Sequence, residues 1–161
     1  MSSVRRVIAA DIRGPHSSDV ATFRATQVIR RPPADVFDAI IHVERFPEWN
    51  PARNPRARRL SAGPVGPGSE FELHIKGFGA VRQTLEEFDD GRQVRIVPHI
   101  RQLSGGHLFR LTDLGDGRTR VDHELEMRPK GIFKLLMPIM WMTGKQNLAE
   151  TMRALERHLE R

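Results

Sequence analysis

Two adjacent prolines, Pro32 and Pro33, separate a strand-like run from a helix-like run and set the order of the first elements. Residues 22–31 are rich in β-branched and aromatic side chains, which favours a strand. Pro33 suits the first turn of a helix, where a missing N–H leaves no hydrogen bond unmade. Apolar residues then recur at helical spacing as far as about Val43. The sequence therefore predicts a strand followed at once by a short amphipathic helix.

The next segments are shorter and are set by their prolines and charges. Pro47 and Pro51 confine the chain to a turn of helix that carries Trp49, and the exposed-looking Glu48 beside it is a weak candidate for chemistry. Residues 53–62 have weak strand character. We interpret their arginines as the charged side chains of an edge strand rather than as a surface for lipid or RNA. These arginines are Arg53, Arg56, Arg58 and Arg59.

The hairpin around Gly115-Asp116-Gly117 can be registered residue by residue. The glycines predict a three-residue loop with Gly117 at a positive φ. This register sets Leu111 opposite Val121 and Phe109 opposite His123. One face of the strand pair is then apolar except for histidines, and the other is charged.

Two earlier hairpins extend the same face. One pairs Leu85 with Ile96, and the Gly77-Phe78-Gly79 turn pairs Ile75 with Val81. The three registers agree and predict an antiparallel sheet. Its inner surface consists of Phe71, Leu73, Ile75, Val81, Leu85, Val94, Ile96, Phe109, Leu111, Val121, Leu125 and Met127.

The C-terminal segment 131–160 predicts a helix of about 28 residues that covers this surface. Its apolar stripe consists of Trp141, Leu148, Met152, Leu155 and Leu159, with charged residues, Glu156 among them, largely outside it. Pro138 and Gly144 are expected to bend or loosen the first half. Residues 132–142 are apolar nearly all round, which suggests a cavity entrance, a dimer contact or contact with a membrane surface.

The elements and motifs together resemble the helix-grip, START-like superfamily called SRPBCC, in its polyketide cyclase/dehydrase and lipid-transport-like branch. The resemblance covers residues 21–160 and rests on the Pro32-Pro33 junction, the segment 46–51, the hairpin 105–127 and the terminal helix. It implies an α+β fold in which a curved seven-stranded antiparallel sheet wraps around a long C-terminal helix, with two short helices after the first strand. It also implies a hydrophobic cavity between the sheet and the long helix. Residues 1–20 are expected to form a flexible extension ahead of a single domain, 21–161.

Three polar residues fall on the apolar inner face: Gln83, His107 and His123. Buried polar groups without partners are costly, so each needs one. The favoured interpretation is that they bond to one another or to water, followed by ligand contact and then by acid–base catalysis, for which His107 and His123 are the candidates. We expect the ligand-binding cavity to be lined by Trp49, Phe71, Leu73, Ile75, Gln83, Leu85, Ile96, His107, Phe109, Leu111, Val121, His123, Leu125, Met127, Met137 and Trp141.

The composition of the chain argues against several classes of function. The chain has no cysteine and no inward carboxylate beside the two histidines, so neither a metal site nor a cofactor is expected. The net charge of +6 comes from 26 basic and 20 acidic residues spread along the chain, which we interpret as solvating rather than nucleic-acid binding. No segment predicts a membrane span or a signal peptide, so a cytoplasmic monomer or homodimer is expected.

Three functions fit these expectations. The first is a binding or carrier protein for a hydrophobic small molecule or lipid, which the apolar inner face supports. The second is a polyketide cyclase, aromatase or dehydratase that uses an inward histidine. The third is a protein-interaction module, which would be favoured by a cavity filled with its own side chains. The sequence leans away from an enzyme.

Overall fold

The computed structural model describes residues 20–161, and it has the α+β helix-grip architecture. The expected extension, 1–20, lies outside the described residues except for Val20, as do the side chains of Met137, Met140 and Trp141. The strands are β1 (Ala21–Ile29), β2 (Ala57–Arg59), β3 (Glu70–Ile75), β4 (Gly79–Asp89), β5 (Gln93–Pro98), β6 (Leu103–Gly115) and β7 (Arg118–Pro129). The helices are α1 (Pro33–Ile41), η1 (Val43–Arg45), α2 (Phe46–Trp49), η2 (Gly131–Leu136) and α3 (Met137–Leu159).

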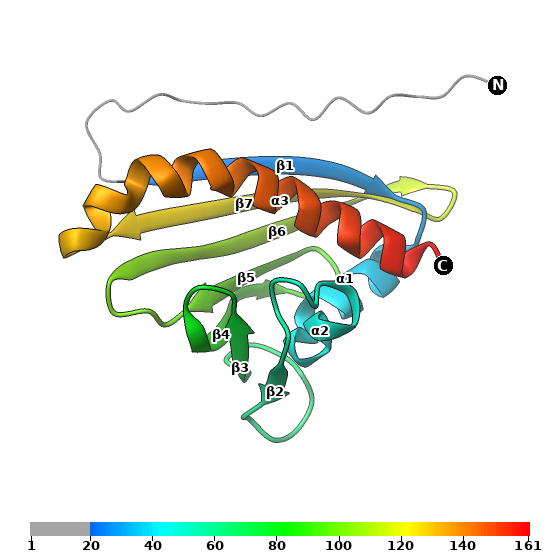
Figure 1. Cartoon of the computed structure of the whole chain (residues 1–161). Helices are drawn as coiled ribbons and strands as arrows, with labels where there is room; N and C mark the ends of the chain where they lie inside the picture. The colour runs from blue at the N-terminus through cyan, green and yellow to red at the C-terminus, as the bar shows by residue number, and fades with distance from the viewer. Residues whose placement is uncertain (1–19) are drawn as a thin grey trace.

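The seven strands form one antiparallel sheet in the order β1-β7-β6-β5-β4-β3-β2. The first and second strands are therefore its two edges, and β2 is the short basic edge strand expected from the sequence. The sheet curves around α3, which runs along β1 and β7, while α1 and α2 lie near the C-terminal end of α3 (Figure 1). This arrangement leaves one face of the sheet turned towards α3 and the other towards solvent.

The predicted β6–β7 register is confirmed, with Leu111 opposite Val121 and Phe109 opposite His123. The loop itself differs from the prediction. Asp116 and Gly117 alone form it, with φ of 54° and 66°, as in a two-residue type I′ turn. A bulge between Asp113 and Gly115 takes up the extra residue, so the strands keep the predicted pairing.

The β3–β4 register was predicted wrongly by two residues. Ile75 lies opposite Gly79, not Val81, and Leu73 takes Val81 as its partner. Gly77 and Gly79 both adopt positive φ, so the chain reverses one residue earlier than expected. A shift of two residues keeps each side chain on its own face, and the predicted inner surface is unaffected. The Leu85–Ile96 pair of β4 and β5 is confirmed.

Helix α3 packs its predicted stripe on the sheet, and Leu148, Met152 and Leu155 are all buried. It is shorter than expected, with 23 residues, because Gly131–Leu136 forms a 3-10 turn instead. Pro138 was expected to bend or loosen the first half of the helix, but it is the second residue of α3 and so belongs to the first turn, where proline is tolerated.

At Gly144 the helix α3 lies close against β1. A Cβ at this position would lie 2.9 Å from a ring carbon of Phe23 in β1. Glycine therefore serves tight packing here rather than the expected loosening. Glu156, expected outside the stripe, is half-buried at the border of the contact and accepts a hydrogen bond of 2.7 Å from the buried amide of Gln27.

Candidate functional site: a histidine pair and an arginine beneath the long helix

His107 and His123 come together on the inner face, as their diagonal positions predicted. Nδ1 of His107 lies 2.9 Å from Nε2 of His123. The ring of Phe109 stacks on His123 at a centroid distance of 4.0 Å. The pair is thus held by two central strands and by an aromatic neighbour.

Both imidazoles are neutral at pH 7. Burial lowers the pKa of His107 to about 4, and the positive charge of Arg53 contributes to this shift. Burial, and then His107 itself, lowers the pKa of His123 well below its ordinary value. A neutral imidazole has one N–H and one acceptor nitrogen, so one ring donates to the other.

We assign His123 Nε2–H as the donor and His107 Nδ1 as the acceptor. Nδ1 of His123 is buried and has no hydrogen-bond partner among the described residues. The assignment leaves a lone pair there, instead of an unpaired buried N–H, which structures rarely tolerate. It also leaves the remaining N–H of His107 available to a ligand.

Gln83 does not join the pair. It is buried on β4, and no hydrogen bond from its side chain to another described residue is found. Among residues 20–161 there is also no group of three histidine, aspartate or glutamate residues placed to hold a metal ion. The polar content of the inner face is therefore the imidazole pair and one separate amide.

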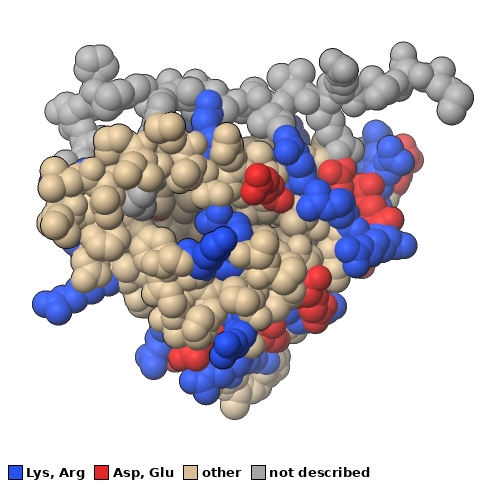
Figure 2. Space-filling view, viewed as in Figure 1, with Lys and Arg blue, Asp and Glu red and all other residues tan. Residues whose placement is uncertain are grey.

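His107 lies on a partly accessible part of the inner face. Although His107, Ile75 and Leu125 lie on inner positions of the sheet, each keeps some exposed surface, whereas Phe71, Leu85 and Val121 are fully buried. The surface in Figure 2 is hollowed near α3, with basic side chains beside the opening. Leu125 lies opposite Phe23, whose ring meets Gly144, so the accessible part of β7 is level with the first half of α3.

The structure divides the predicted lining residues into two groups. Ile75, His107 and Leu125 are partly accessible. The other group is buried and consists of Trp49, Phe71, Leu73, Gln83, Leu85, Ile96, Phe109, Leu111, Val121, His123 and Met127. The side chains of the two remaining residues, Met137 and Trp141, lie outside the described part of the chain.

Arg53 is the site residue that the sequence analysis missed. Its side chain is half-buried, and its charge acts on both His107 of β6 and Glu150 of α3, so it reaches between the sheet and the helix. Burial lowers the pKa of Arg53, and the carboxylate of Glu150 opposes this shift. No carboxylate in the described residues forms an ion pair with it.

Backbone contacts hold Arg53 in this position. Its N–H donates to the carbonyl of Asn50, and its own carbonyl accepts from the N–H of Lys76 at 2.9 Å. The loop after α2 is therefore attached to the β3–β4 turn. Such contacts have no sequence period, which is why the arginine could not be distinguished from its exposed neighbour Arg56.

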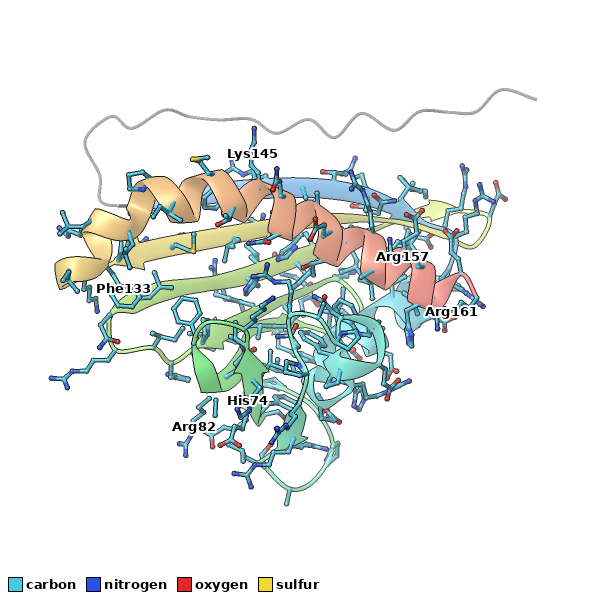
Figure 3. All side chains as sticks on the ribbon, viewed as in Figure 1. His74, Arg82, Phe133, Lys145, Arg157 and Arg161 are labelled. Carbon is cyan, nitrogen blue, oxygen red and sulfur yellow. The ribbon has the colours of Figure 1, made fainter. Side chains whose placement is uncertain are left out.

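An aromatic contact bridges the open side of the molecule. Phe78 in the β3–β4 turn and Phe133 in η2 have ring centroids 6.4 Å apart. Phe133 lies between η2 and that turn, whereas Lys145 projects from α3 away from the sheet (Figure 3). The contact joins the start of the terminal helix to the far strands of the sheet.

Trp49 occupies the other end of the core. It is buried and packs against Phe46 at a ring distance of 4.7 Å, and its Nε1 has no partner in the described residues. Glu48 is exposed and pairs with Arg45 at 3.3 Å, as expected of a solvated carboxylate. Trp49 is therefore part of the packed end of the domain.

A curved antiparallel sheet that grips a long C-terminal helix over a partly open apolar face defines the START-like, helix-grip class. The chain belongs to the polyketide cyclase / dehydrase and lipid transport family, whose model matches residues 20–160. No curated protein matches the chain.

Solved structures show the same fold at low sequence identity. A START superfamily protein from Mycobacterium smegmatis has a TM-score of 0.67 and 15% identity, over 86% of this chain and 97% of that one. The protein XoxI from Bacillus cereus has a TM-score of 0.65 and 15% identity, over 86% and 95%. A norcoclaurine synthase mutant from Thalictrum flavum, in complex with a transition-state analogue, has 0.68 and 11%, over 90% and 97%.

Proposed function

We propose that the protein binds a hydrophobic small molecule or lipid in the hollow between α3 and the inner face of the sheet. The observation that carries this proposal is the accessible surface of Ile75, His107 and Leu125 within an otherwise packed apolar face. Ligand sites are mostly apolar and contain few, well-placed polar groups. The family description, which includes lipid transport, supports the same function.

The polar groups indicate one end of the ligand. The free N–H of His107 and the guanidinium of Arg53 are both donors, and Arg53 carries a full positive charge. Donors without partners favour a ligand that supplies an acceptor. We therefore propose an amphipathic ligand whose carboxylate, carbonyl or phenolate group lies at Arg53 and His107.

The same geometry gives less support to acid–base catalysis. With a pKa of about 4, His107 is neutral at pH 7 and a weak base. An effective catalytic base has a pKa near the working pH. The pair is better suited to donating a hydrogen bond than to accepting a proton.

The proposal is tested by extracting the natively purified protein with organic solvent and identifying any bound compound by mass spectrometry. Titration with oleate and with oleyl alcohol then compares an anionic ligand with a neutral one of the same chain length. Loss of a charged hydrogen bond of about 1.5–3 kcal/mol should weaken oleate binding by about 10- to 100-fold in Arg53→Gln. Oleyl alcohol should be affected less.

Arg56→Gln is the matched control, because Arg56 lies in the same loop and is exposed. It should leave both affinities unchanged. An empty extract together with no binding of either compound would contradict the proposal and favour a protein-interaction role. Equal effects of the two arginine variants would contradict the assignment of Arg53.

A further inference from the structure

The largest exposed apolar side chains of the described structure are concentrated on η2 and the first turns of α3. Ile132, Leu135 and Met142 are 72%, 78% and 73% exposed, and Ile139 is 63% exposed. No residue of η2 is buried. We call this group, Ile132, Leu135, Leu136, Ile139 and Met142, the apolar lip.

An exposed surface of this kind needs a physical reason. Exposed large aliphatic side chains are normal when they are scattered, but a contiguous group usually marks an interaction site. The lip does not stabilise the fold, since its side chains point away from the core that Leu148, Met152 and Leu155 form on the same helix. It therefore has a function outside the packed domain.

The charges next to the lip in the sequence are mainly basic. No acidic residue occurs between Glu126 and Glu150, whereas this interval contains Lys130, Lys134 and Lys145, besides Arg128, which pairs with Glu126 at 2.6 Å. The N–H of Lys130 also donates to the carbonyl of Gln102 at 2.8 Å, which brings the β5–β6 loop with Arg101 to the same end. The lip thus has a basic surround, and the whole chain has a net charge of +6.

We propose that the apolar lip inserts into the headgroup region of an anionic phospholipid bilayer, while the basic side chains around it contact lipid phosphates. Aliphatic side chains flanked by lysines are the composition that binds membrane interfaces. Each basic residue near an anionic surface adds about 1 kcal/mol of attraction at physiological ionic strength. An anionic bilayer therefore matches both the apolar lip and the basic side chains around it.

A second copy of the chain matches it less well. In a two-fold symmetric dimer the same patch faces itself, so the basic side chains around one lip would face those around the other. Facing like charges oppose association. A bilayer instead supplies an apolar layer and negative charge together.

The position of the lip fits this partner. Phe133 of η2 meets Phe78 across the open side of the molecule, so the lip lies beside the route into the hollow. Among the described residues no helix is long and apolar enough to cross a membrane. The lip accordingly rests on the surface of the bilayer.

The test uses vesicles of phosphatidylcholine and vesicles that also contain phosphatidylglycerol. The full chain should sediment with the second kind and release from it as salt is raised. Replacing Leu135→Ser and Ile139→Ser together should weaken this binding by about tenfold or more. Leu114→Ser is the control, because Leu114 is 40% exposed at the bulge of β6 just before the β6–β7 turn, at the opposite end of the sheet.

A second measurement keeps the test valid if the double variant fails to fold. The chain has no cysteine, so Leu135→Cys and, separately, Leu114→Cys each accept one environment-sensitive dye. The dye at residue 135 should shift to the blue with anionic vesicles, and the dye at residue 114 should not. Similar responses at both positions, or no vesicle binding, would overturn the proposal.

The dye measurement also distinguishes a bilayer from a protein that covers the apolar lip. A blue-shifted dye at residue 135 before vesicles are added would mean that protein covers the lip. Sedimentation equilibrium would then identify a second copy by a doubled mass, and either finding overturns the membrane proposal. Vesicle binding that persists in Arg53→Gln separates the role of the lip from that of the proposed ligand site.

Discussion

His123 is a buried imidazole with a hydrogen bond on only one nitrogen. Its neighbours are the ring of Phe109 and the imidazole of His107, neither of which carries a negative charge. Protonating either histidine would place a charge in the core without a carboxylate beside it. The pair therefore links the stability of the fold to pH.

This linkage has a definite sign. Folding lowers the pKa of His107 from 6.5 to about 4 and lowers that of His123 as well, so the unfolded chain binds more protons than the folded one within this interval. The stabilisation is fully present above pH 6.5 and is lost as the pH falls towards 4. Each histidine should contribute a slope of at most about 1.4 kcal/mol per pH unit.

Urea unfolding at a series of pH values measures the slope. The double variant His107→Gln, His123→Gln should flatten it, whatever its absolute stability. The control variant is His99→Gln, which replaces an exposed histidine next to β5. If the double variant kept the slope of the parent protein, groups other than these two histidines would cause the pH dependence of stability.

At the level of elements, the contact between α3 and β1 depends on a missing side chain. Gly144→Ala should gain up to about 1 kcal/mol in helix propensity. The added methyl would meet the ring of Phe23 at 2.9 Å, and overpacking of a core costs about 1–3 kcal/mol. We expect a net loss of stability.

A double-mutant cycle in urea tests this expectation. Phe23→Leu alone should destabilise, but it should destabilise less when Gly144→Ala is present, because the smaller side chain makes room for the methyl. Gln146→Ala, on the exposed side of α3, should be harmless. If Gly144→Ala were more stable than the parent, the close contact would not limit the packing.

The β6–β7 register makes a second prediction for elements. Val121 is fully buried opposite Leu111, and Val121→Asp should unfold the domain because an unpaired charge enters the core. Thr112 is exposed opposite Arg120, and Thr112→Asp should change stability by about 0.5 kcal/mol or less. Circular dichroism and urea unfolding compare the two. Similar losses in both would contradict the register.

The register of a strand pair could be predicted where a different turn geometry still left the same residues paired. The β6–β7 pairing could be predicted because alternating side chains and Gly117 agree. The β3–β4 pairing failed because Gly77 and Gly79 offer two places to reverse the chain, and local pattern does not choose between them. The alternation of faces survived because it depends only on whether a residue number is odd or even.

At the scale of the whole molecule, the site depended on contacts that no local pattern contains. The histidine pair could be predicted from the register, since both residues follow from strand pairing. Arg53 could not, because its inward position depends on a loop attached to a distant turn. The apolar lip was visible as a run without polar alternation, but its exposure became clear only when η2 and α3 were placed against the sheet.

The strand order also has a consequence for how the protein is made. Among the described strands β1 pairs only with β7, from Ala21 opposite Met127 to Ile29 opposite Thr119. The first strand to leave the ribosome therefore stays unpaired until the last strand has been made. During translation β1 therefore presents unpaired backbone groups and apolar side chains, and closing so long a loop carries an entropic penalty. A ribosome that stalls before β7 releases a nascent chain with no way to cover β1. Cellular quality control would recognise such a product by this strand.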